Sequence, residues 1–170
     1  MNPNAAPHFG SDMSPVVEGN AVALPDLHEP LRHHQGGNLE AAITGYRAFL
    51  RQQPDHAEAH QLLGLALFAR GDIQPAREAL ERAAKLAAPS APLLNDLGNI
   101  CRAARDAEAA LEAFSAAIAA DANFAFAYFN LADAALEAGQ FQRAIDVYGD
   151  IVARGFAGVD GDFHVNHGLA

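Results

Sequence analysis

Two histidines are the first side chains of this sequence to consider for chemistry. His56 and His60 lie four residues apart, which would place both on one face of a helix and suit a zinc ion with further ligands. Two candidate ligands fall short of the three or four that zinc takes from a protein, and the spacing is not the His-Glu-x-x-His pattern of metalloproteases. The sequence therefore predicts local structural roles for both histidines and no metal site.

The single cysteine, Cys101, excludes an intramolecular disulfide and a cysteine-based zinc site. It lies in an apolar segment with Leu97 and Ala104, which favours a buried, unreactive thiol over a nucleophile. The sequence contains no P-loop, dinucleotide fingerprint or Gly-x-Ser-x-Gly motif. We therefore predict that the chain is not an enzyme and has neither catalytic residues nor a cofactor.

Two further polar clusters are interpreted as structural. His33 and His34 precede a pair of glycines, where a cationic imidazole would complement the C-terminal end of a helix dipole. The segment 160–162, Asp-Gly-Asp, lacks the regularly spaced oxygen ligands and the final glutamate of an EF-hand loop. It is interpreted as a polar turn.

Composition restricts both the fold and the partner. The 170 residues are rich in Ala and Leu and poor in β-branched residues, which favours one all-α domain. The formal net charge of −10 argues against nucleic acid or an anionic membrane as the main partner. No segment resembles a secretory signal or a membrane span. These features together predict a cytoplasmic location.

A period of 34 residues organises the elements that would carry any site. Four groups of residues recur at this interval: Ala42, Ala76, Ala110 and Ala144; Ala23, Ala57, Ala91 and Ala125; the large residues Tyr46, Leu80, Phe114 and Tyr148; and Gly37, Gly71 and Gly139. The period indicates stacked copies of one helix hairpin, in which the large residue of each copy fills the space beneath the next.

Each hairpin has local signals for its turn and its crossing point. The glycines can adopt the left-handed conformation that ends the first helix. Asn38, Asp72 and Asp106 follow these turns and are predicted N-caps of the second helix, whereas Gln140 stands at the fourth position. Small residues are needed where the two helices cross, and the sequence places Gly64, Gly98 and Ala132 there.

These motifs resemble the tetratricopeptide repeat family. The resemblance implies a right-handed α-solenoid of antiparallel helix hairpins. Its expected parts are a disordered leader at 1–22, four repeats at 23–56, 57–90, 91–124 and 125–156, and the start of a further repeat or a capping helix at 157–170. Pro30 should shorten the first helix, and Arg105 replaces the glycine of the third unit. Residues 168–170 resemble 64–66, which predicts that the chain is the N-terminal piece of a longer protein.

The resemblance also implies a binding face, because the first helix of each hairpin lines the concave groove in this family. The corresponding residues of this chain are Gln61, Leu62, Leu65, Phe68, Asn95, Asp96, Asn99, Arg102, Phe129, Asn130, Asp133 and Glu137. Amides in such a groove can both donate to and accept from a peptide backbone. Since Arg102 is the main cation of the set, the expected partner is a polar or basic peptide or protein rather than a C-terminal carboxylate.

Three functions remain open at this point. The first is a protein interaction scaffold that binds an extended peptide or protein partner. The second is a substrate-presenting segment of a larger bacterial glycosyltransferase or sulfotransferase, because residues 168–170 resemble the opening of a further repeat that is cut short. By analogy, Asn130 occupies the asparagine-ladder position of the O-linked N-acetylglucosamine transferases, whereas Asp96 replaces the asparagine one unit earlier. The third is self-assembly into a homo-oligomer, because a final hairpin without a cap would expose apolar surface.

Overall fold

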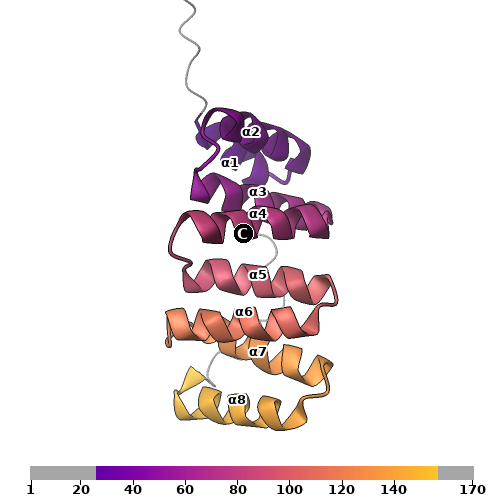
Figure 1. Cartoon of the computed structure of the whole chain (residues 1–170), viewed down its shortest axis with the longest axis vertical. Helices are drawn as coiled ribbons and strands as arrows, with labels where there is room; N and C mark the ends of the chain where they lie inside the picture. The colour runs from indigo at the N-terminus through magenta and orange to yellow at the C-terminus, as the bar shows by residue number, and fades with distance from the viewer. Residues whose placement is uncertain (1–25, 157–170) are drawn as a thin grey trace, which may run out of the picture.

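A computed structural model describes residues 26–156 of the chain, and helices account for most of this range. Within it the chain forms eight helices and no strand, so the predicted all-α fold is confirmed. The helices follow one another down the long axis of the molecule (Figure 1). Their bounds are α1 His28–Gln35, α2 Leu39–Gln52, α3 Ala57–Arg70, α4 Ile73–Leu86, α5 Ala91–Ala103, α6 Ala107–Ala120, α7 Ala125–Glu137 and α8 Phe141–Ala153.

Consecutive helices pack as hairpins that stack into a solenoid. We call α1, α3, α5 and α7 the first helices and α2, α4, α6 and α8 the second helices. Each first helix packs on its own second helix and, beyond the first hairpin, on the second helix that precedes it. The expected leader at 1–22 and the expected further element at 157–170 lie outside the described residues. No helix between residues 26 and 156 combines the length and apolar character that a membrane span requires.

The turn inside each hairpin adopts the left-handed conformation. Gly37, Gly71 and Gly139 have φ angles of 75°, 93° and 71°, as predicted. Arg105 occupies the same position in the third hairpin, with a φ of 61°. A side chain at such an angle crowds the following carbonyl, which costs about 1–2 kcal/mol. The fold therefore imposes the turn on a residue that is poorly suited to it.

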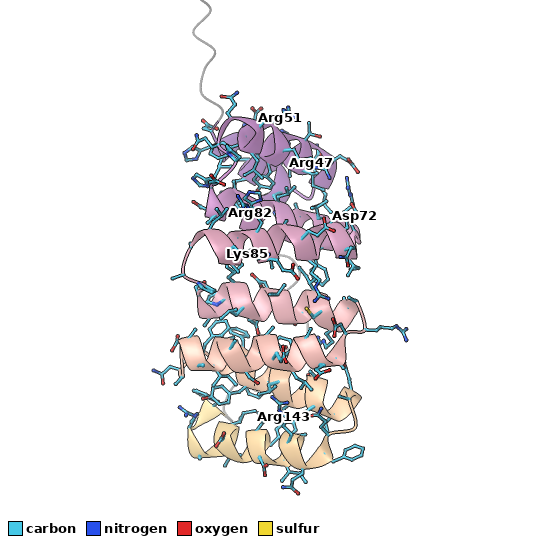
Figure 2. The ribbon with its side chains drawn as sticks, in the orientation of Figure 1. Arg47, Arg51, Asp72, Arg82, Lys85 and Arg143 are labelled. Carbon is cyan, nitrogen blue, oxygen red and sulfur yellow. The ribbon has the colours of Figure 1, made fainter. Side chains whose placement is uncertain are left out.

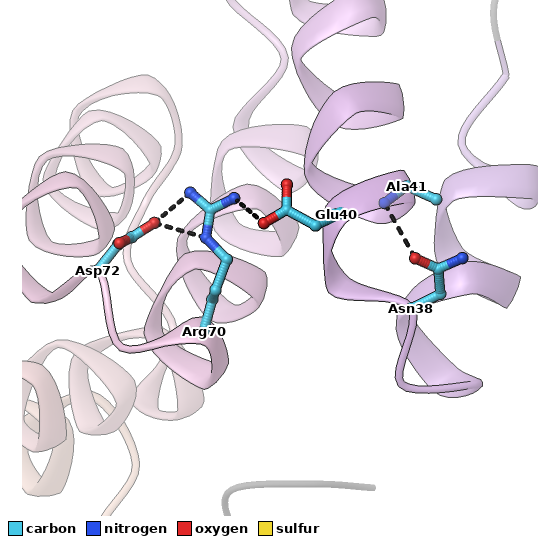
Figure 3. Close-up of polar contacts among 5 residues, drawn as sticks. All are labelled: Asn38, Glu40, Ala41, Arg70 and Asp72. Atoms are coloured by element: carbon cyan, nitrogen blue, oxygen red, sulfur yellow. Dashed lines mark hydrogen bonds and ion pairs between the residues drawn. The ribbon is translucent and has the colours of Figure 1, made fainter.

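Two of the three predicted N-caps of the second helices are confirmed. The side chains of Asn38 and Asp106 accept hydrogen bonds from the backbone N–H groups three residues later, each over 3.2 Å. Asp72 does not cap α4. Its carboxylate accepts instead from Arg70 Nε over 2.7 Å, and the same guanidinium pairs with Glu40 of α2 (Figure 3). A charge-assisted bond outcompetes the neutral backbone donor here.

Small residues lie where the helices of a hairpin cross, as predicted. A Cβ atom on Gly64 would lie 1.8 Å from Leu80 Cδ1, and one on Gly98 would lie 2.4 Å from Phe114 Cε1. Ala132, at the third crossing, is completely buried. The glycines therefore allow the large side chain of the second helix to lie against the backbone of the first.

The apolar core runs along the stack of hairpins. Tyr46, Leu80 and Phe114 are completely buried beneath the hairpin that follows each of them. Tyr148, the fourth residue of this series, is 39% exposed. It departs from the prediction because no described helix follows α8.

Pro30 sets the geometry of the first hairpin. It lies in the first turn of α1, which is only eight residues long, as predicted from the proline. Its ring is buried against Gly45 of α2, where a Cβ atom would lie 2.5 Å from Pro30 Cγ. The short first helix is therefore packed firmly onto the stack.

Candidate partner-binding groove

The helices α3, α5 and α7 lie on the inner side of the stack. Successive first helices contact one another more extensively than successive second helices do, so the stack curves toward the first helices. All twelve groove residues expected from the sequence lie on α3, α5 and α7. The proposed site therefore lies on three adjacent, packed helices, which hold its side chains at fixed spacing.

Polar side chains link these three helices in pairs. Asn130 Nδ2 on α7 donates to Asn95 Oδ1 on α5 over 2.8 Å. Gln61 on α3 forms a side-chain hydrogen bond with Asp96 on α5. Both pairs join residues 35 positions apart, 130 − 95 and 96 − 61. The repeat therefore brings the same two rows of the groove together at both junctions.

The sequence reasoning placed these residues on one face but did not foresee that they bond to one another. Asn95 is only 5% exposed and uses its carbonyl on Asn130, so a partner would reach its amide only in part. The signal was available in the 35-residue spacing of polar residues on successive first helices. Asn95 therefore serves mainly to hold the side chain of Asn130 in place and is poorly accessible to a partner.

Asp96 is the most perturbed acid of the groove. Burial raises its pKa to about 6, and the hydrogen bond from Gln61 opposes that rise. Removal from water outweighs a single neutral donor. A carboxylate in this state is stabilised by a cation brought close to it.

The α3 part of the groove is apolar. Leu62 and Phe68 pack partly against the core cluster around Leu63 and Leu67, and Leu65 is half-buried beside them. Each of the three keeps part of its surface exposed. This end can receive an apolar side chain of a partner.

The α5 and α7 part of the groove is polar. Asn99 and Arg102 are half-buried on α5, and the Asp133 carboxylate accepts from the Tyr148 hydroxyl of α8 over 3.3 Å. Phe129 packs partly on the C-terminal core cluster. The Tyr148 contact was not predicted, because Tyr148 was expected to serve the core alone.

A surface hollow lies at the turn end of this polar part. It has a volume of about 500 Å³, and Arg102 and Glu137 both line it. Arg105 also lines the hollow. The sequence had indicated only that Arg105 replaces the glycine of the repeat pattern. Glu137 of α7, Arg102 of α5 and Arg105 of the turn after α5 therefore border the same hollow.

The second helices carry charged side chains of both signs. Figure 2 labels five of their cations: Arg47, Arg51, Arg82, Lys85 and Arg143. Among the twelve groove residues, three are acidic and one, Arg102, is basic. The twelve groove residues therefore carry a net formal charge of −2.

The two histidines that were considered as zinc ligands, His56 and His60, make local hydrogen bonds. His56 Nδ1 accepts from the Ala59 N–H over 3.2 Å, and His60 Nε2 donates to the Pro54 carbonyl over 2.8 Å, as their predicted structural roles require. No group of three potential metal ligands occurs in the part of the chain that the structure describes. The Asp-Gly-Asp segment at 160–162 lies outside it.

Cys101 is buried as predicted, at 2% exposure, and this burial raises the pKa of its thiol. Ala104, expected beside it in the core, is exposed at the C-terminal end of α5. His33 and His34 lie in the last turn of α1, as expected. The His34 ring packs on Tyr46, with Nδ1 3.3 Å from the hydroxyl, and burial lowers the pKa of His34, which disfavours its cationic form.

Comparison with solved structures supports this description of the fold. A crystal structure of MamA is 26% identical, with a TM-score of 0.70 over 74% of this chain and 73% of the MamA chain. YrrB, a tetratricopeptide repeat protein with an unusual peptide-binding site, is 18% identical, with a TM-score of 0.67 over 74% of this chain and 64% of its own. At that identity the likeness shows the fold alone.

A third solved structure belongs to a larger enzyme. The O-GlcNAc transferase of Thermobaculum terrenum, in its K341M mutant, is 26% identical with a TM-score of 0.60. The match covers 64% of this chain and 21% of the transferase. No curated protein matches the sequence.

The sequence profile of one family matches most of the chain. The tetratricopeptide repeat profile covers residues 33–92 and 95–157, each match spanning two of the stacked hairpins. The turns, crossing points and paired helices described above are the physical basis of this match. The chain belongs to the tetratricopeptide repeat family.

Proposed function

We propose that the groove of α3, α5 and α7 binds an extended, polar or basic segment of a protein partner, and that the chain is a non-catalytic scaffold. The observation that carries the proposal is the pairing of Gln61 with Asp96 and of Asn95 with Asn130. These pairs fix donors and acceptors at one spacing along the groove. An extended backbone presents its own donors and acceptors at regular intervals, which such a ladder can bind.

The charge of the groove supports a basic partner. Asp96, Asp133 and Glu137 lie along α5 and α7, whereas the cations labelled in Figure 2 lie on second helices. The raised pKa of Asp96 indicates a carboxylate that lacks a compensating cation in the free protein. A Lys or Arg of the partner would supply one, and the charge pattern would also steer its approach.

The apolar end of the groove supports a defined orientation of the partner. Leu62, Leu65 and Phe68 on α3 are partly exposed, and the acidic residues lie on the next two helices. A segment with an apolar side chain at one end and a basic one at the other would match both ends.

The proposed setting is the cytoplasm, where the thiol of Cys101 stays reduced.

Selection and calorimetry together test this proposal. Random peptides displayed on phage would be selected on the full chain, and the enriched peptide would be titrated against Asn99→Ala and Phe68→Ala. Each substitution should weaken binding about tenfold, which corresponds to about 1.4 kcal/mol. Glu112→Ala, an exposed change on α6, is the matched control and should leave affinity unchanged. Unchanged affinity in both folded groove variants would reject the groove as the binding face.

A second candidate function rests on the likeness to the O-GlcNAc transferase. We propose, as the alternative, that these hairpins present protein substrates to an enzymatic region encoded further along the same gene. The 26% identity over 64% of this chain supports it, as does Asn130 at the ladder position. Sequencing the gene downstream of the Ala170 codon tests it directly. An immediate stop codon would remove this alternative and leave the scaffold proposal intact.

A further inference from the structure

The surface hollow at the turn end of the groove is lined by two arginines that depart from the repeat pattern. Arg102 stands 34 residues after Phe68 and 34 residues before Leu136, so the second and fourth hairpins carry a large apolar side chain at this position. Arg105 stands where the other hairpins have the glycine of the turn. The third hairpin therefore differs from its neighbours twice within four residues, and both differences place a guanidinium beside the same hollow.

The backbone conformation of Arg105 supports a role for its side chain. Among the non-glycine residues between 26 and 156, only Arg105 has a positive φ angle, 61°. Glycine takes this conformation without steric cost, so an arginine here keeps a strain that glycine would remove. Strained residues of this kind cluster at binding and active sites.

Neither guanidinium of the hollow is neutralised within the described part of the chain. There the side chains of Arg102 and Arg105 form no hydrogen bond or ion pair. Arg70, at the corresponding end of α3, bonds to two carboxylates. Asp106, the acid nearest to Arg105 in sequence, is already held by Arg77 over 2.9 Å. The two guanidiniums of the hollow therefore have donors available for an anion.

The rest of the lining suits a short aliphatic stem behind that anion. The hollow has a volume of about 500 Å³, which is enough for a side chain. The positive end of the α6 dipole borders it, because the first residue of α6 is part of the lining. Methyl groups of α5, α6 and α7 form the remaining walls: Ala103, Ala107, Ala110 and Ala134.

The charge of the lining favours a carboxylate over a phosphate. Glu137 of α7 is exposed and is the one acid that lines the hollow, so two arginines and one glutamate give the lining a formal charge of +1. A carboxylate carries a single negative charge, and its two oxygens match the parallel N–H groups of a guanidinium. A phosphate would bring a charge of about −2 and meet stronger repulsion from Glu137.

We propose that this hollow binds the carboxylate of a Glu or Asp side chain of the protein partner, with Arg102 and Arg105 as the donors. The inference rests on the proposed function and adds to it a second charged contact. Arg102 belongs to both the groove and the hollow, so the two surfaces are continuous. The partner segment would then carry a basic side chain at Asp96 and an acidic side chain at the turn end of α5.

Peptide selection on matched variants tests the proposal. Random peptides displayed on phage would be selected separately on the full chain and on the double variant Arg102→Gln with Arg105→Gly. Peptides from the parent should carry Glu or Asp at one fixed distance from their basic residue, and peptides from the double variant should not. Arg47→Gln with Arg51→Gln removes two exposed cations of α2 and should keep the acidic residue enriched.

Calorimetry with the parent-selected peptide then measures the contact. Replacing its Glu by Gln, or its Asp by Asn, should weaken binding to the parent and to the α2 control about tenfold. The same replacement should leave binding to the double variant unchanged. Arg105→Gly alone should lose affinity although it relieves the strain of the turn, which a purely structural role of the arginine would not produce.

Two results would overturn the proposal. One is an equal frequency of Glu and Asp in the peptides from the parent and from the folded double variant. The other is an equal loss of affinity in these two proteins when the acidic residue of the peptide is replaced. The groove has its own outcome, because unchanged affinity in Asn99→Ala and Phe68→Ala rejects the groove whatever the arginines do. Circular dichroism of each variant keeps the comparison among folded proteins.

Discussion

The third hairpin, α5 and α6, and the fourth, α7 and α8, have the same design in different surroundings. In the third, Leu111 and Phe114 are buried, Asp96 stands in the groove and Arg105 makes the turn. In the fourth, the matching residues are Ile145 and Tyr148, which are exposed, and Asn130 and Gly139.

The comparison shows that turn geometry is set within a hairpin, whereas burial of the second helix depends on the neighbouring hairpin. Both hairpins have a left-handed turn, so turn geometry survives the change from glycine to arginine. Burial differs between them, since the second helices of the two hairpins carry similar side chains but only α6 has a described helix, α7, packed over it. Stability in this molecule is therefore largely a property of the junctions between hairpins.

The largest effect is expected from truncating two matched side chains, Leu111, which is buried, and Ile145, which is exposed. Leu111→Ala should lower the free energy of unfolding by about 2–5 kcal/mol, because Leu111 is buried beneath α7. Ile145→Ala should cost less, about 0.5 kcal/mol, because the Ile145 side chain is 62% exposed. Urea denaturation of the full chain measures both. Equal costs at the two positions would contradict the difference between the hairpins.

The next effect concerns the acid in the groove of the third hairpin. The pKa of Asp96 is about 6 in the folded protein against 3.8 for the free side chain, so the folded state binds more protons between these values. The free energy of unfolding should therefore fall as pH rises through this window. Asp96→Asn, which copies Asn130 of the fourth hairpin, should be more stable at neutral pH by about 1–2 kcal/mol.

Urea denaturation at two pH values checks this. The advantage of Asp96→Asn should disappear below about pH 3, where the carboxyl is protonated in both the folded and the unfolded state. Glu112→Gln, on the exposed face of α6, serves as the control and should track the parent at both pH values. A variant that is less stable than the parent at neutral pH would show that the charge of Asp96 stabilises the groove.

The smallest effect concerns the turn. Arg105→Gly should raise the free energy of unfolding by about 0.5–1 kcal/mol, since relief of the left-handed strain exceeds the entropy gained by the unfolded chain. Gly139→Ala in the fourth hairpin should lower the free energy of unfolding by about 1 kcal/mol, because it places a side chain at a left-handed φ angle. Thermal melting resolves both changes. A neutral or destabilising Arg105→Gly would mean that the arginine side chain makes a compensating contact.

Most of the fold could be predicted from the sequence because its determinants are local and repeat. The 34-residue period, the glycines of the turns and the small residues at Gly64 and Gly98 each specify one contact within a hairpin. Asp72 was not predictable in this way. Its capping role is lost to Arg70, and that competition depends on the position of Glu40 in the preceding hairpin.

The sequence predicted which residues lie on the inner helices but not their hydrogen bonds or their pKa values. The repeat register places Asn95 and Asn130 on the inner face, yet their hydrogen bond depends on how closely α5 and α7 approach. The raised pKa of Asp96 likewise arises from burial between helices rather than from its neighbours in sequence. Such properties emerge only when the hairpins stack.

Hydrogen exchange of the complex with the selected peptide tests the central claim most directly. If the groove binds the peptide, protection should increase in peptic fragments of α3, α5 and α7 and stay unchanged in fragments of α4 and α6. The same experiment with Asn99→Ala should show a smaller increase at equal peptide concentration. Protection confined to the second helices would contradict the account.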